Sequence, residues 1–146
     1  MNYGRLAGAA VAAAVVDLIY GFVVYGMLLR SEFSRYPAIY RPPEDMSYMG
    51  YLTLGILIGT FTATYIYAKG YEGGAGASEG ARFGACVGVF VGGYIGLVNY
   101  AVMNVGRKVV VGVAAAGFFE WILLGVVIGL IYKPAAVAAP RKAAGV

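Results

Sequence analysis

The chain has 146 residues, of which 61% are hydrophobic and 23 are glycine, and it carries a formal net charge of +4. Together with a mean hydropathy of +0.77, this composition is too apolar and too rich in glycine for a water-soluble domain of this size. The Lys and Arg residues are spread over loops and tail without a basic helix face, which argues against nucleic-acid binding. Histidine is absent and one cysteine is present, so the usual zinc and haem ligand is missing and no intrachain disulfide can form.

Four apolar stretches are each long enough to cross a membrane: 6–29, 48–68, 83–103 and 109–132. They occupy most of the chain and leave only short connections, so we expect no soluble catalytic domain. The predicted fold is all-α, a bundle of four transmembrane helices over residues 1–134, followed by a disordered tail at 135–146. The first stretch does not look like a secretory signal, because Asp17 interrupts it and a second span follows.

The first span carries a carboxyl group into the membrane. Asp17 shares a helical face with four small residues: Ala10, Ala13, Ala14 and Gly21. Because an acid facing lipid is costly, we expect Asp17 to point toward the interior of the bundle. The loop that follows, 30–47, is the longest connection in the chain and is predicted to form a structured cap.

The second span carries Gly55 and Gly59, and then three threonines that we expect to bond to their own helix backbone: Thr60, Thr62 and Thr64. The connection after it, 72–80, is rich in glycine, which predicts a flexible hinge. This connection lacks the Gly-Lys-Ser/Thr ending of a phosphate-binding loop, so we do not interpret it as a nucleotide site.

The third span places glycine at four successive i, i+4 positions: Gly84, Gly88, Gly92 and Gly96. Small residues at this spacing form a groove that lets a neighbouring helix approach closely, an arrangement known as a glycine zipper. We therefore expect this span to be the centre of the bundle and to contact more neighbours than any other span.

The fourth span repeats a pattern of the second. Leu-Gly-Ile-Leu-Ile-Gly at 54–59 is followed, seventy residues later, by Leu-Gly-Val-Val-Ile-Gly at 124–129, which contributes Gly125 and Gly129 as a second GxxxG pair. One interpretation is a tandem duplication of a two-helix hairpin. The other is chance similarity between apolar helices that are both rich in glycine.

Four polar side chains are predicted to lie in one layer near the middle of the membrane. At about 1.5 Å per residue, Asp17 and Glu120 lie about 16 and 18 Å inside the end of their spans that faces the termini, Tyr94 about 18 Å and Thr60 about 14 Å. One interpretation is a proton or cation relay in which Asp17 and Glu120 are the carriers. The alternative is that protonated acids bond to Tyr, Thr or backbone groups and fix the register of the helices.

The sequence also resembles a known group of proteins. The opening Met1-Asn2-Tyr3-Gly4-Arg5-Leu6, the Asp17 segment ending in Tyr25-Gly26-Met27-Leu28-Leu29, and the four-span size are similar to small bacterial four-helix membrane proteins grouped under a domain of unknown function. The resemblance implies the architecture alone, and no site residue is carried over from it.

Two classes of function stay open. The first is a structural or accessory subunit that packs through glycine-rich helix faces into a homo-oligomer or a larger membrane complex. The second is a small channel or transporter for protons or cations that uses Asp17 and Glu120. We do not expect an enzyme, a cofactor or a metal site, since no nucleophile with a base, no metal cluster and no cofactor motif is present.

The distribution of positive charge predicts the orientation. Six Lys and Arg residues lie on the side of the two termini and five lie on the other side. This bias favours both termini in the cytoplasm, and we expect the chain in the plasma or inner membrane. Lipid and other membrane subunits, including copies of the chain itself, are the expected partners.

Overall fold

The computed structural model of the chain describes residues 1–42 and 44–132, which form helices and contain no strand. Four helical stretches are long and apolar enough to cross a membrane: Tyr3–Leu28, Met49–Lys69, Gly76–Val102 and Arg107–Ile131. The predicted all-α fold with four transmembrane helices is therefore confirmed. Residues 133–134 of the predicted membrane domain and the tail predicted at 135–146 lie outside the described residues.

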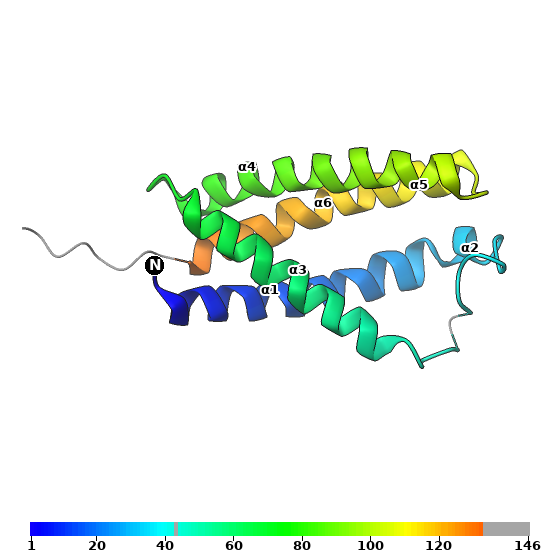
Figure 1. Cartoon of the computed structure of the whole chain (residues 1–146), viewed down its shortest axis with the longest axis horizontal. Helices are drawn as coiled ribbons and strands as arrows, with labels where there is room; N and C mark the ends of the chain where they lie inside the picture. Colours follow the sequence, from blue (N-terminus) through cyan, green and yellow to red (C-terminus); the bar gives the residue numbers. More distant parts are fainter. Residues whose placement is uncertain (43, 133–146) are drawn as a thin grey trace, which may run out of the picture.

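The helices run back and forth between two ends of the molecule (Figure 1). In chain order they are α1 (Tyr3–Val23), η1 (Val24–Leu28), α2 (Arg30–Phe33), α3 (Met49–Lys69), α4 (Gly76–Val89), η2 (Phe90–Ile95), α5 (Gly96–Val102) and α6 (Arg107–Ile131). The segments η1 and η2 are wide π turns that continue α1 and α4. The N-terminus and the turn between α3 and α4 lie at one end of the bundle, and α2 lies at the other, near the turn between α5 and α6.

The backbones of α4 and α6 are in direct contact. A methyl group added to Gly80 or Gly84 would come closer than 3.0 Å to the backbone of α6, at Gly125 and Trp121. The same holds for Gly76 against Gly129. Further along, a methyl group would meet α6 at 3.0 Å from Gly88 and Gly92, and at 3.7 Å from Gly96. Gly76, Gly80 and Gly84 therefore allow a helix contact that no larger residue would permit.

Helix α4 begins inside the connection that the sequence predicted to be a hinge. It starts at Gly76, so the prediction of a flexible loop at 72–80 was wrong for its second half. The reason is twofold. The glycine backbone packs against α6, and the buried Glu79 carboxylate accepts hydrogen bonds from the N–H groups of Glu72, at 2.7 Å, and Gly74, at 2.8 Å. The acceptor groups of Glu79 hold the preceding turn against the start of the helix.

The helix with the most neighbours is α6. It packs against α4 on one side and α1 on another, and it also contacts α2, α3, η2 and α5. The third span, α4 to α5, packs mainly against α6, and its outer face is exposed, with Val89 at 63% and Leu97 at 66%. The prediction that the third span is the central one was therefore wrong. Its glycines serve one close contact, whereas α6 has packing residues on two faces.

The apolar core lies at the end of the bundle that holds the N-terminus. It joins the first half of α1, the second half of α3 and the second half of α6, through Leu6, Ala9, Ala13, Ala63, Tyr67, Leu124, Ile128 and Tyr132. Helix α3 is held only by this part. Its buried residues begin at Thr60, and nothing lies within 4 Å of a methyl group added at Gly55 or Gly59. The first half of α3 therefore stands away from its neighbours.

The opposite end of the bundle is closed by the long first loop. The hydroxyl of Tyr36 accepts a hydrogen bond of 2.9 Å from the N–H group of Gly106, in the turn before α6. Arg41 pairs with Asp45 at 3.1 Å within the loop. These contacts agree with the expectation of a structured cap, and the Tyr36 hydrogen bond ties the loop to the turn before α6.

The contact between α4 and α6 predicts a specific loss of stability. We expect Gly84→Ala to lower the free energy of unfolding by about 1–3 kcal/mol, because the new methyl group overlaps the backbone at Trp121. The measurement is equilibrium unfolding of the purified protein in mixed detergent. The matched control is Gly8→Ala, at a position with open space around it, which should leave stability unchanged or slightly raised. Equal stability of the two variants would show that the helices do not touch here.

Candidate functional site

The carboxyl groups of Asp17 and Glu120 meet inside the bundle. Asp17 projects from α1 and is partly buried, and Glu120 projects from α6 and is 8% exposed. Each lies within hydrogen-bonding reach of the other. A hydrogen bond between two carboxyl groups requires a proton on one of them, because two adjacent negative charges repel. The pair is therefore a place where a proton can be held and passed from one oxygen to another.

Two tyrosines of the first span hold this pair in place. The Tyr25 hydroxyl donates a hydrogen bond of 2.9 Å to Oε2 of Glu120. The Tyr20 hydroxyl donates one of 2.8 Å to the carbonyl oxygen of Ala116, one turn before Glu120. The two rings pack edge to face with centroids 6.2 Å apart. Tyr20 and Tyr25 therefore fasten α1 and η1 to the stretch of α6 that carries the acid.

The position of Tyr25 depends on local backbone features. It lies in the π turn η1, in which the N–H group of Leu29 bonds back to the carbonyl of Val24. Such wide turns inside membrane helices reorient a side chain relative to a regular helix and occur often at functional sites. Gly117 of α6 lies beside the phenol, and a methyl group there would make an ordinary van der Waals contact of 3.8 Å with the Tyr25 hydroxyl oxygen.

No described basic residue neutralises the carboxyl pair. The ion pairs of the described residues lie in the loops or near the ends of the spans: Arg30–Glu44, Arg35–Glu32, Arg41–Asp45 and Arg82–Glu72. Within the part of the chain that the structure describes, no three His, Cys, Asp or Glu side chains come together in a way that could hold a metal ion. Negative charge at the pair is therefore balanced by protons or by something that enters from outside.

The structure brings together two of the four residues that the sequence placed in one layer. Thr60 is buried, but its hydroxyl donates to the carbonyl groups of its own helix at Ile56, 2.9 Å, and Leu57, 3.2 Å. Tyr94 is 62% exposed on η2, where it stacks on Phe90. Neither residue joins the Asp17–Glu120 pair. Depth along a span was predictable, but the direction in which each side chain points was not.

Sequence reasoning missed Tyr20 and Tyr25, although a signal for one of them was present. Asp17, Gly21 and Tyr25 are spaced i, i+4 and i+8 and so share a face of the first span. A tyrosine two turns from an inward-facing acid can reach the same neighbouring helix. Tyr20 lies three residues after Asp17, which also places it near that face.

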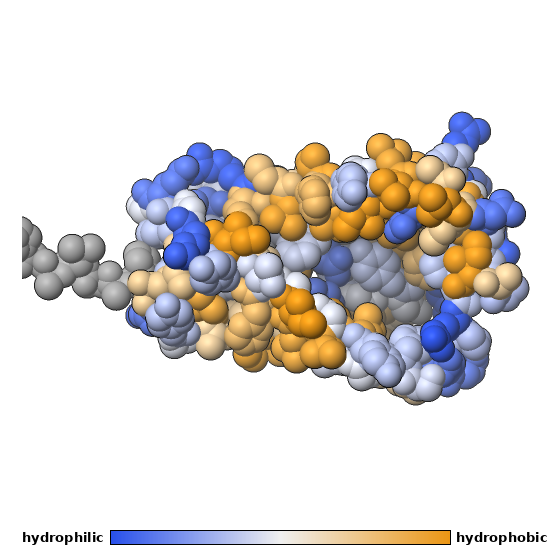
Figure 2. Space-filling model, in the orientation of Figure 1, coloured by the Kyte–Doolittle hydropathy of each residue, from blue (hydrophilic) through white to orange (hydrophobic). Residues whose placement is uncertain are grey.

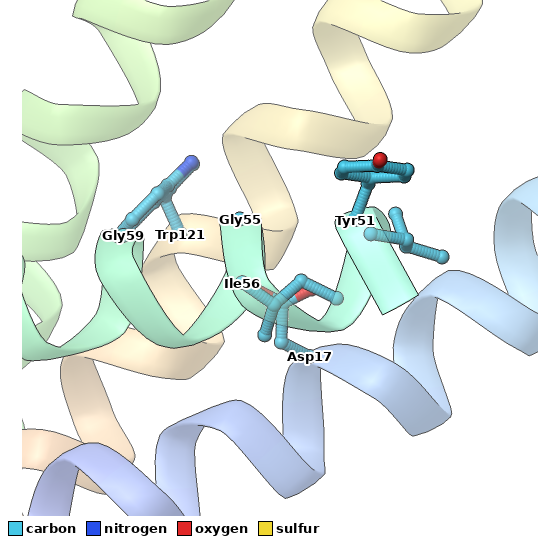
Figure 3. Close-up of a pocket in the computed structure, with 7 residues that line it drawn as sticks. Asp17, Tyr51, Gly55, Ile56, Gly59 and Trp121 are labelled. Carbon is cyan, nitrogen blue, oxygen red and sulfur yellow. The ribbon is translucent and has the colours of Figure 1, made fainter. Parts of the chain in front are cut away.

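A cleft opens beside the carboxyl pair. It has a volume of about 390 Å³ and is lined by Asp17, Tyr51, Leu52, Gly55, Ile56, Gly59 and Trp121. Figure 3 shows Asp17 on α1 directed toward α3, with Ile56 directly across from it. The space-filling view shows the face of the molecule hollowed beside α3, with hydrophilic surface inside the hollow (Figure 2). The cleft exists because the first half of α3 stands away from α1 and α6.

No protein-family model, no curated protein and no solved structure matches the chain. The interpretation of the site therefore rests on its geometry.

The hydrogen bond from Tyr25 gives the second prediction. We expect Tyr25→Phe to lower the free energy of unfolding by about 1–3 kcal/mol, because it leaves a buried oxygen of Glu120 without its donor. Tyr94→Phe is the control, since it makes the same chemical change at an exposed hydroxyl. Both are measured by unfolding in mixed detergent. Equal effects of the two substitutions would contradict the role given to Tyr25.

Proposed function

We propose that the chain is a small integral-membrane transport protein that carries protons, or a cation in exchange for protons, by means of Asp17 and Glu120. The single observation that supports this proposal is the contact between the two carboxyl groups, with Tyr25 as donor and no described basic residue beside them. The four helices that are long and apolar enough to cross a membrane would place this carboxyl pair inside a multi-pass membrane protein.

The energetic cost of the pair favours a functional role. A charged acid near the bilayer centre costs about 2.5–3.5 kcal/mol or more, and such residues mark ion and proton pathways. Glycine contacts join α4 to α6, and an apolar core joins α1, α3 and α6, so the bundle has other means of fixing its helices. Placing two acids together would cost free energy that helix packing alone does not require.

The two acids have different access, which suggests different roles. Asp17 lines the cleft, whereas Glu120 is not among the residues that line it and accepts a hydrogen bond from Tyr25. In the proposed mechanism Asp17 exchanges a proton with whatever occupies the cleft. Glu120 shares that proton through the carboxyl contact, and Tyr25 keeps the Glu120 carboxyl oriented toward Asp17.

A second candidate function is a structural or accessory subunit. It is favoured by the first half of α3, where Gly55 and Gly59 form a GxxxG pair that no described residue covers. A helix of another copy, or of a different membrane subunit, could pack there. The glycines of α4 and α6 give less support to this candidate, because they face each other within the chain. We propose no enzymatic activity, and the cytoplasmic position of both termini stays a prediction.

The test is proton flux in liposomes that contain the purified protein and carry a pH gradient. We expect Asp17→Asn and Glu120→Gln each to abolish the flux that depends on the protein, because neither replacement can hold an exchangeable proton. The matched control is Glu44→Gln, in the first loop, where the side chain is 77% exposed, and it should retain flux.

Flux that is unchanged by both Asp17→Asn and Glu120→Gln would overturn the transport proposal. In that case crosslinking in native membranes decides on the accessory role. A cysteine introduced at Gly55 should then form crosslinks to a second subunit, whereas one at Tyr94 on the far helix should not.

A further inference from the structure

This inference rests on the proposed transport function and names its substrate class. We infer that the cleft between α3 and Asp17 binds a hydrophobic organic monocation, which enters sideways from the lipid and replaces a proton at the carboxyl pair. Four features of the cleft support this inference: its charge, its aromatic side chains, its size and the position of its opening.

The charge of the cleft selects a cation. Asp17 is its one ionisable acid, and no Lys or Arg is among the residues that line it. The remaining lining is apolar or aromatic, apart from the hydroxyl of Tyr51. When the carboxyl pair loses its proton, negative charge remains beside the cleft, where a positive group can balance it. An anion of the same size would be repelled.

The aromatic side chains favour an organic cation. Tyr51 of α3 and Trp121 of α6 both line the cleft, and Figure 3 shows them at opposite ends of the stretch of α3 that carries Gly55 and Gly59. The faces of such rings attract ammonium-type and phosphonium-type cations most strongly where water is scarce. A bare metal ion is a poor fit, because hard cations require six or more oxygen ligands and the lining offers one carboxylate.

The size of the cleft fits a small organic molecule. Its volume of about 390 Å³ lies in the lower part of the range of small-molecule sites, roughly 300–1,000 Å³. Gly55 and Gly59 keep it open, since nothing lies within 4 Å of a methyl group added at either position. Larger residues at these two positions of α3 would fill the space that the ligand needs.

The position of the opening favours a hydrophobic ligand. Asp17 lies about 16 Å inside its span. The cleft lies beside Asp17, with α3 on one side and helices α1 and α6 on the other. A molecule that reaches this depth from the side must first dissolve in the lipid. The substrate class is therefore a cation with enough apolar surface to enter the bilayer.

Cation binding should release a proton. The titratable groups that face this region are Asp17, Tyr20 and Tyr25 of the first span, Glu120 of α6 and Tyr51 of α3. The carboxyl pair with one proton and the pair with one bound monocation have the same total charge, so each cation that binds should displace about one proton.

The experiment uses the full-length protein in detergent and two probes of equal shape and opposite charge. Tetraphenylphosphonium is the cation and tetraphenylborate is the anion. Trp121 is the only tryptophan of the chain and lines the cleft, so its fluorescence reports directly on occupancy. We expect saturable quenching by the cation with release of about one proton per molecule bound, and no saturable response to the anion.

Three variants test the location. Gly55→Leu and Gly59→Leu should each weaken binding of the cation by at least about tenfold by filling the cleft, and Asp17→Asn should do the same by removing its charge. The matched control is Gly8→Leu, at another open glycine outside the cleft, which should bind normally. Equal binding by Gly8→Leu, Gly55→Leu and Gly59→Leu would overturn the inference, as would equal responses to the two probes.

The binding experiment and the proton-flux experiment can give different results, and each combination has a distinct meaning. Proton flux by the wild-type protein without binding of tetraphenylphosphonium would overturn the substrate class and leave proton transport standing. Binding that depends on Asp17, in a protein without proton flux, would support the cleft and overturn transport.

Discussion

Direct contact between the backbones of α4 and α6 is the constraint on which the rest of the bundle depends. Glycine at Gly80 and Gly84 on one helix, and at Gly125 and Gly129 on the other, brings the two backbones together without an intervening side chain at these positions. In lipid, where apolar side chains gain little by leaving their surroundings, such close packing is a main source of helix association. Since α4 takes up one face of α6, another face is free to pack against α1.

The contact between α6 and α1 determines the site. Small residues along α1, among them Ala9 and Ala13, are fully buried and allow α1 to lie close to Leu124 and Ile128 of α6. Next to this apolar contact, toward the other end of the bundle, Asp17 and Tyr25 of the first span meet Glu120 of α6. The carboxyl pair and its tyrosines therefore continue the apolar α1–α6 interface toward the other end of the bundle, where α3 no longer covers it.

The two hairpins of the chain use similar sequences in different ways. The glycines at Gly125 and Gly129 are in backbone contact with α4, whereas those at Gly55 and Gly59 meet nothing within 4 Å. The partner helix explains the difference. The glycines of α4 lie directly opposite those of α6, whereas α1, the neighbour of α3, has alanines only in its first half. The looser hairpin leaves the cleft, so the part of the bundle that packs least tightly is the part to which a ligand has access.

Sequence alone predicted the four apolar spans, because hydropathy and length depend on local composition. It also placed Asp17 and Glu120 near the middle of their spans, because the helical rise per residue is fixed. It also identified Gly84 and Gly88 as a close-packing face. It could not determine which helix would lie on that face, nor how each helix is rotated about its axis, because both depend on how well two surfaces fit. Tertiary packing therefore made α6 the central helix, turned Tyr94 outward and brought Tyr25 to Glu120.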